Sequence, residues 1–241
     1  MTYGLPYMGS KSNIADWVIA HLPPADTFVD LFAGGCAVTH AALLSGRFRH
    51  VIANDVQGDV PALFRDALQG ILPPDYLHAI TREEFHLRKG ASPYIRLVWS
   101  FGSNAQNYIF GEDVERIKLL AHSMLCEDSL HERHRLYGAF YSELVDLLRA
   151  RPDDDRAASI SSINRIKRIL ALRSPALAER LTVSAVSYDE VCPPPVKFSG
   201  LRRSAVSRHR GVCRRVRLRP VRLLVAVDPV SRLYFGVHHA A

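Results

Sequence analysis

The sequence has few cysteines and no long apolar run. Its 241 residues include four cysteines, and no two of them form a C-x-x-C pair. Scattered cysteines favour a reduced compartment and argue against a disulfide framework or a zinc site. No apolar run reaches the roughly 20 residues that a membrane span needs, and the first residues lack the charged-then-apolar pattern of a signal peptide. We therefore expect a cytoplasmic protein with no metal and no membrane partner.

Acidic residues are almost absent from one segment. Residues 197–241 hold ten arginines and one lysine but a single acid, Asp228, so this segment carries a formal charge of +10. Because the whole chain carries +7, residues 1–196 carry −3. The segment is either a nucleic-acid-binding arm, since arginines bind phosphate, or a stretch without a designed role, such as the product of a shifted reading frame. The abrupt change in composition favours the second interpretation.

The first part of the chain has the pattern of a strand, a helix and a second strand. FVDLFAGGCAV at residues 28–38 predicts a short strand that ends in a glycine turn, followed by a helix over about 37–44. HVIAND at residues 50–55 predicts a second strand, followed by a helix at about 61–68. Such a unit forms a parallel sheet whose ligands bind at the carboxyl ends of the strands. The predicted fold class is therefore α/β.

The middle of the chain is predicted to be mainly helical. A capping box, T-x-x-E at residues 81–84, opens one helix. Residues 92–111 are rich in aromatics, glycine and amides, and predict a structured loop between short strands. Helical spacing runs through residues 112–150 and again over about 161–172, and LTVSAVSYDEV at 181–191 predicts a strand and a turn. The apolar stripe expected along 112–150 consists of Leu119, Leu120, Leu125, Leu144, Leu147 and Leu148.

The stretch GLPYMGSKS near the N-terminus looks at first like a phosphate-binding loop. Gly4 and Gly9 have the separation of such a loop, but Ser10 stands between Gly9 and Lys11, where the lysine should follow directly. Pro6 also removes a backbone N–H that a phosphate cradle would use. The stretch therefore predicts that residues 7–12, YMGSKS, form a loop that presents Lys11 to some other ligand, and we call it the lysine loop.

Asp55 and the glycines after the first strand form a second candidate site. In dinucleotide-binding and related folds, an acid at the end of the second strand accepts hydrogen bonds from ribose hydroxyls. Gly34 and Gly35 would let a ligand approach the backbone near a helix N-terminus. Taken singly, each feature is also typical of an ordinary tight turn or of a helix cap. Together with the lysine loop, they predict a small ligand that contains a ribose.

These motifs, in this order, resemble the Dam-type DNA adenine-N6 methyltransferases, including phage-borne members of that family. The resemblance covers about residues 3–192, and it is carried by segments in both the first part and the middle of the chain. The matching segments are YMGSK at 7–11, FVDLFAGGCAV at 28–38, IANDV at 52–56, WSFGSNAQNYIFG at 99–111 and LTVSAVSYDEV at 181–191. One departure is that a second glycine is often found where Cys36 stands.

The resemblance implies a Rossmann-like S-adenosylmethionine-dependent methyltransferase sheet with a helical target-recognition insertion. It implies S-adenosyl-L-methionine as cofactor and double-stranded DNA as partner, in a restriction-modification setting. Tyr7 and Lys11 would contact the methionine and adenosine portions of the cofactor. Phe32 and Gly34 would line the cofactor cleft, and Asp55 would hold the ribose.

The same resemblance predicts how the chain divides into parts. Residues 1–80 would form the cofactor-binding α/β part, and residues 81–180 the helical DNA-recognition insertion. Residues 181–196 would return to the sheet. Residues 197–241 would be an atypical arginine-rich tail, disordered or derived from a shifted frame.

The catalytic motif of the family is not found where it is expected. Methylation of an adenine amine requires the base to leave the stack and to be held by polar and stacking contacts, for which this family uses D-P-P-[YFW]. That motif should follow SYDEV closely, but the sequence there reads CPPPVKFSG, without an acid or an aromatic at the matching spacing. Asp228-Pro229-Val230 lacks the second proline and the aromatic, and we interpret it as a coincidence. The catalytic residues thus stay unknown, and we expect little or no methyl transfer.

Two alternatives remain at this stage. The first is a non-catalytic nucleic-acid-binding protein that uses the arginine-rich C-terminal segment for phosphate contacts. The second is a truncated product with an incomplete sheet, whose exposed apolar edge would promote aggregation.

Overall fold

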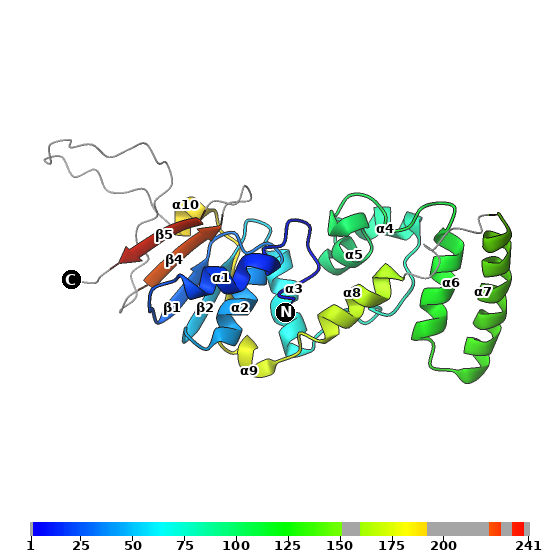
Figure 1. The fold of residues 1–241 in the computed structure, drawn as a ribbon, viewed down its shortest axis with the longest axis horizontal. Coiled ribbons are helices and arrows are strands. Elements are labelled where there is room, and N and C mark those ends of the chain that lie inside the picture. The colour runs from blue at the N-terminus through cyan, green and yellow to red at the C-terminus, as the bar shows by residue number, and fades with distance from the viewer. Residues whose placement is uncertain (1, 151–159, 192–221, 228–232, 239–241) are drawn as a thin grey trace, which may run out of the picture. The chain divides into compact units, whose positions relative to one another are not determined.

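The computed structural model describes residues 2–150, 160–191, 222–227 and 233–238. Five described strands form one sheet in the order β3-β2-β1-β4-β5, and Figure 1 labels β1, β2, β4 and β5. The strands are β1 (Thr27–Asp30), β2 (His50–Asn54), β3 (Leu181–Ser184), β4 (Arg222–Val227) and β5 (Leu233–His238).

Four of the strands run parallel. β1 pairs in parallel with β2 on one side and with β4 on the other, and β2 pairs in parallel with β3. β5 is antiparallel to β4. Thr27 is in register with both His50 and Arg222, so β1, β2 and β4 end at the same edge of the sheet. The predicted α/β class and its parallel strands are thus confirmed, and two strands of the sheet come from the arginine-rich segment.

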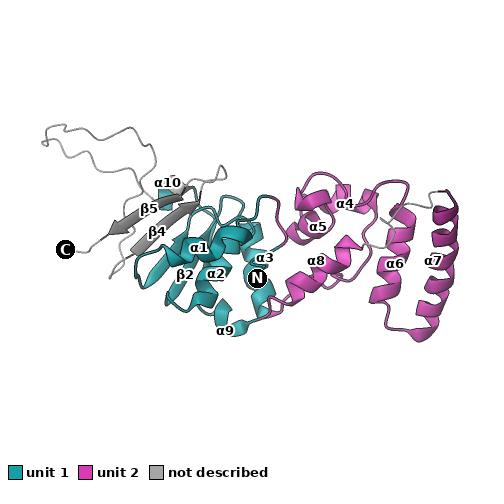
Figure 2. Cartoon of the chain, viewed as in Figure 1, with its two compact units in different colours: residues 1–5, 9–69, 174–241 teal, residues 6–8, 70–173 magenta. Residues whose placement is uncertain are grey.

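The contacts divide the chain into two units (Figure 2). The first unit comprises residues 1–5, 9–69 and 174–241, and the second comprises residues 6–8 and 70–173. Besides the sheet, the first unit contains η1 (Ser12–Ile14), α1 (Ala15–Ala20), α2 (Ala37–Ser45), α3 (Asp59–Gln69), α9 (Pro175–Ala178) and α10 (Tyr188–Val191). The second unit contains α4 (Arg82–Arg88), α5 (Pro93–Val98), η2 (Phe101–Ser103), α6 (Glu115–Cys126), α7 (Leu130–Ala150) and α8 (Ser161–Leu170).

Helix α2 is the central helix of the first unit. Every residue from Ala37 to Leu43 is buried, and the helix packs against α1 and against both β1 and β2. A helix that is apolar nearly all round belongs in an interior. Beneath it, the fully buried rings of Phe28 and Phe48 pack with their centroids 5.3 Å apart, each contributing about 1.5–3 kcal/mol by burial. Phe28 is the second residue of β1 and Phe48 lies two residues before β2, so this packing holds the amino ends of the two strands together.

The described part of the second unit is helical and is built around Trp99. The Trp99 ring is fully buried and packs against the rings of His122 and Phe110, with centroids 4.8 and 6.1 Å away. The Arg165 guanidinium donates to the carbonyls of Val98 and Ser100, at 2.7 and 2.5 Å. Since the last carbonyls of a helix lack partners within it, Arg165 completes the end of α5.

The capping box predicted for residues 81–84 is confirmed. The Glu84 N–H donates to Thr81 Oγ1 at 3.2 Å, and the Thr81 N–H donates to Glu84 Oε2 at 3.0 Å.

Among the described residues, no helix has both the length and the apolar composition for crossing a membrane.

Two predictions for the middle of the chain were wrong. Residues 93–98 form helix α5 and not a loop between strands, because the Ser92 side chain caps it and Pro93 fits the first turn. The expected stripe along 112–150 is interrupted, because Glu127 takes an extended conformation after α6. The helical phase restarts in α7, and two leucines of the expected stripe, Leu125 in α6 and Leu148 in α7, are exposed.

Candidate functional site

The carboxylate of Asp55 links the loops that follow β1 and β2. The Gly34 N–H donates to Asp55 Oδ2 at 2.8 Å, and the Gln57 N–H donates to Asp55 Oδ1 at 2.9 Å. The side chain is half-buried. Because a carboxylate has about four lone-pair sites, each oxygen retains room for a further donor such as a hydroxyl group. Asp55 therefore combines a fixed orientation with capacity for a ligand.

Asp30 is a second acid at the same sheet edge, but it is buried. Thr39 Oγ1 donates to Asp30 Oδ2 at 2.7 Å. Burial raises the pKa of Asp30 to about 6, with a smaller contribution from the charge of Asp55, although hydrogen bonds from Thr39 and Phe32 oppose the shift. Asp30 thus anchors α2 to the end of β1 and is not placed to meet a ligand directly.

The turn after β1 has an unusual backbone. Gly34 and Cys36 both have positive φ, at 46° and 59°, a left-handed conformation that costs a non-glycine residue about 1–2 kcal/mol. The Cys36 thiol is fully buried, and burial, followed by the nearby charges of Asp30 and Asp55, raises its pKa. It is therefore an unreactive thiol at a position that favours glycine, which accounts for the glycine often found there in the family that the sequence resembles.

Asn54 was not identified from the sequence as a site residue. It is buried at the end of β2, where its Nδ2 donates to the carbonyls of Leu31 and Val186 at 3.2 and 3.1 Å. The Val186 N–H donates back to Asn54 Oδ1 at 3.3 Å. Asn54 therefore joins the chain segments that follow β1 and β3. The available signal was a polar residue ending an apolar strand, directly before Asp55.

The N-terminal segment lies against the turn after β1. The Leu5 N–H donates to the Gly35 carbonyl at 2.8 Å, and Gly4 has φ 67°. A Cβ at position 4 would lie 2.2 Å from the Gly35 oxygen, so only glycine fits here. The lysine loop follows, and Lys11 Nζ donates to the Gly9 carbonyl at 3.0 Å.

The structure brings together some of the predicted site residues. Gly34 and Asp55 are in direct contact, and Phe32, between β1 and Gly34, is 41% exposed. Lys11 is half-buried and belongs to the same unit, whereas Tyr7 belongs to the second unit.

The remaining sequence predictions concern the catalytic motif and metal binding. The segment CPPPVKFSG and the candidate Asp228-Pro229-Val230 lie outside the described residues, although β4 ends at Val227, next to the end of β1. Within the described ranges, no three histidine, cysteine or acidic side chains are grouped as metal ligands would be.

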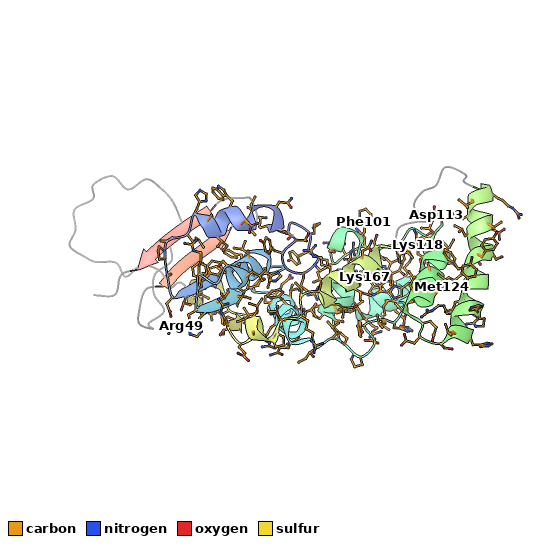
Figure 3. All side chains as sticks on the ribbon, turned by 60° about the horizontal axis from the view of Figure 1, so that its bottom comes forward. Arg49, Phe101, Asp113, Lys118, Met124 and Lys167 are labelled. Atoms are coloured by element: carbon orange, nitrogen blue, oxygen red, sulfur yellow. The ribbon has the colours of Figure 1, made fainter. Side chains whose placement is uncertain are left out.

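The second unit presents one exposed aromatic ring on a tightly bonded loop. The Phe101 N–H donates to the Asn107 carbonyl at 2.7 Å, and Asn104 Oδ1 accepts from the N–H groups of Gln106 and Asn107 at 2.9 and 3.0 Å. Ser103 and Ala105 have positive φ, a strain that occurs at functional sites more often than elsewhere. Phe101 is 65% exposed on this loop (Figure 3).

Comparison with known proteins agrees with these motifs. The model of the D12 class N6 adenine-specific DNA methyltransferase family matches residues 7–130. The chain is also similar to the type II methyltransferase M.CviAII of Paramecium bursaria Chlorella virus 1, with 27% identity over 166 residues. That match covers 56% of this chain and 48% of the viral protein, so the chain spans about half the length of the curated relative it matches. On the family match, which extends over half of its length, the chain belongs to the D12 class N6 adenine-specific DNA methyltransferases.

Proposed function

We propose that the chain binds S-adenosyl-L-methionine at the shared carboxyl edge of β1 and β2, as part of a DNA adenine-N6 methyltransferase. The observation that carries this proposal is the Asp55 carboxylate, which is oriented by Gly34 and Gln57 and has lone pairs left for hydroxyl donors. Parallel α/β sheets bind ligands at this edge. Membership in the family supports the same cofactor.

The residues present fit such a cofactor in their chemistry. Asp55 would accept hydrogen bonds from the two ribose hydroxyls, each worth about 1.5–3 kcal/mol because the acceptor is charged. Phe32 offers an exposed ring for apolar contact, and Gly34 keeps the backbone accessible beside it. Lys11, together with Tyr7, would contact the methionine and adenosine portions. When bound, the cofactor would supply a methyl group on a sulfonium.

DNA is the proposed substrate, and we assign its recognition to the helical second unit. The sheet would then be the Rossmann-like core of a methyltransferase, and the second unit its target-recognition insertion. Phe101 is an exposed ring on a rigid loop of this unit, and aromatic rings of this kind stack on nucleobases that have left the duplex.

Methyl transfer by this chain is expected to be weak or absent. The reaction needs an acceptor for the adenine amine and a ring that stacks on the extruded base. The family meets this need with D-P-P-[YFW], which the sequence lacks after SYDEV. We therefore expect the chain to bind the cofactor but to transfer little or no methyl.

A second candidate function is nucleic-acid binding without catalysis. It is favoured by the formal charge of +10 over residues 197–241, because each neutralised phosphate releases a counterion and makes binding depend on salt. Removing the whole segment is a poor test, since β4 pairs with β1. Replacing Arg202, Arg203, Arg208 and Arg210 with serine tests it without deleting a strand. A salt dependence that stays unchanged in this variant would count against the second function.

The first test of the proposed function is calorimetric titration with S-adenosyl-L-methionine. The wild-type chain is expected to bind, and Asp55→Ala to lose most of the affinity. Equal affinity of the two proteins would reject the site. Where binding is seen, transfer of a labelled methyl group to adenine-containing duplexes then measures catalysis separately.

A further inference from the structure

Three consecutive backbone amides attach the N-terminal segment to three different parts of the first unit. The Tyr3 N–H donates to Ser12 Oγ at 2.7 Å, next to Lys11 in the lysine loop. The Gly4 N–H donates to His40 Nδ1 on α2 at 3.1 Å, and the Leu5 N–H donates to the Gly35 carbonyl in the turn after β1 at 2.8 Å. The segment thus connects the lysine loop to the glycine turn.

The hydrogen bond to His40 is the central one of the three, and it is buried. His40 is buried, and its ring lies edge-on to the rings of Tyr3 and Phe64, with centroids 5.8 and 5.5 Å away. Since a backbone N–H can only donate, Nδ1 must be an unprotonated acceptor, which places the proton of the neutral ring on Nε2. No local sequence pattern singles out this histidine in the middle of α2.

The side chain of Tyr3 strengthens the attachment. Its hydroxyl donates to Asp16 Oδ1 on α1 at 2.5 Å. This hydrogen bond, with a smaller effect of burial, raises the pKa of the Tyr3 phenol, so the hydroxyl stays a donor at neutral pH. Tyr3 is therefore held through its backbone by Ser12, next to Lys11, and through its side chain by Asp16 on α1.

We propose that Gly4 and His40 form a clasp that holds the lysine loop against the glycine turn, which makes His40 a positioning residue for the cofactor. The inference rests on the proposed function, because it assumes that Lys11 and the glycine turn contact the same ligand. The clasp fixes the start of the loop before the ligand arrives. A loop that is already ordered loses less conformational entropy on binding, which increases affinity.

Two substitutions at His40 separate the clasp from ordinary packing. His40→Asn keeps an acceptor close to the position of Nδ1 but removes ring volume, whereas His40→Leu keeps volume and removes the acceptor. If His40 only fills space, the amides of residues 3–5 should be less protected in the asparagine variant than in the leucine variant. If His40 holds the clasp, these amides should be less protected in the leucine variant, and the asparagine variant should stay close to wild type.

The first measurement is the rate of hydrogen exchange at the amides of residues 3–5, which is detected by NMR in the absence of cofactor. One net hydrogen bond is worth about 0.5–1.5 kcal/mol, so exchange in His40→Leu should be up to about ten-fold faster. Exchange in His40→Asn should stay near wild type. Unchanged protection in His40→Leu would overturn the clasp. If that variant does not fold, Ser12→Ala removes the acceptor of the neighbouring Tyr3 N–H, and unchanged protection of residues 3–5 in this variant would overturn the attachment of the segment to the lysine loop.

The second measurement is calorimetric titration of the same variants with S-adenosyl-L-methionine. The expected result is an affinity about ten-fold lower for His40→Leu and near wild type for His40→Asn. Equal affinities of wild type and His40→Leu, or a weaker His40→Asn, would overturn the positioning role. A wild-type chain that does not bind would instead reject the proposed function, and the exchange data would still decide whether the clasp exists.

Discussion

The Asp55 carboxylate accepts a hydrogen bond from the Gly34 N–H at 2.8 Å, although 21 residues separate the two in the chain. The bond joins the ends of β1 and β2, which are neighbours in the sheet. It also prevents the side chain from rotating, so that its remaining lone pairs keep one direction. An acid held in this way is suited to a ligand with two adjacent hydroxyl groups.

Replacing Asp55 should therefore reduce affinity for S-adenosyl-L-methionine strongly. With two charge-assisted hydrogen bonds of about 1.5–3 kcal/mol each, Asp55→Ala is expected to abolish measurable binding in calorimetry. Asp55→Asn should retain a small part of it. Asp66→Ala is the matched control, because Asp66 is a surface acid of the same unit that pairs with Arg65. Loss of binding in the control as well would point to a general charge effect.

Replacing Lys11 should have a smaller effect. Lys11→Ala removes one cation and should lower cofactor affinity by about ten-fold, the size of a single charge-assisted contact. Lys11→Arg keeps the charge and should fall between this variant and wild type. Lys167→Ala, on an exposed lysine of the second unit, serves as control. Titrations in which Lys11→Ala binds as tightly as wild type would remove Lys11 from the site.

Asp30 should make stability depend on pH. Its pKa is about 6 in the folded chain against an ordinary value of 3.8, so the folded state holds this proton more tightly than the unfolded state. The resulting stabilisation is fully present below pH 3.8 and is lost as the pH rises through 6. Asp30→Asn, which keeps an acceptor for Thr39, should therefore gain stability relative to wild type by up to about 3 kcal/mol as pH rises over this window.

Denaturant unfolding between pH 4 and 7 measures this difference. Asp26→Asn is the control, since Asp26 is a surface acid that pairs with Arg49. The prediction fails if the difference between Asp30→Asn and wild type is the same at every pH.

Removing the Phe101 ring should weaken DNA binding without affecting the cofactor. Stacking of a base on an aromatic side chain is worth about 1–3 kcal/mol, so Phe101→Ala should lower affinity by roughly five- to a hundred-fold. Leu87→Ala in the same unit is a control for the loss of exposed apolar surface, because Leu87 is 83% exposed. Fluorescence anisotropy with a labelled duplex measures both variants, and equal affinities would exclude Phe101 from the interface.

Local features of the fold could be predicted from the sequence. The strand, glycine turn, helix and strand over β1, α2 and β2 depend on apolar runs and glycines that act over a few residues. The capping box at residues 81–84 likewise depends on two side chains that are three positions apart. Helix α5 carries a start signal, Ser92 followed by Pro93, but the aromatic, glycine and amide residues around it favour a loop.

The choice of Asp55 as a candidate also came from the sequence, through its place after an apolar strand and its resemblance to a known motif. The contacts that orient it did not, because they join segments that are far apart in the chain. Asn54 contacts Val186, 132 positions later, and Gly4 contacts His40, 36 positions later. No local pattern encodes such pairs.

The sequence by itself determined the strand, helix and strand order of β1, α2 and β2, the acid that follows β2 and the lysine near the N-terminus. Only the tertiary structure decided that β4, from the arginine-rich segment, lies beside β1 and that the first residues close over the glycine turn. The physical reason is that propensity and capping act within a turn of the chain. Sheet order and buried hydrogen bonds instead depend on which donors and acceptors, far apart in the chain, can pair once water is excluded.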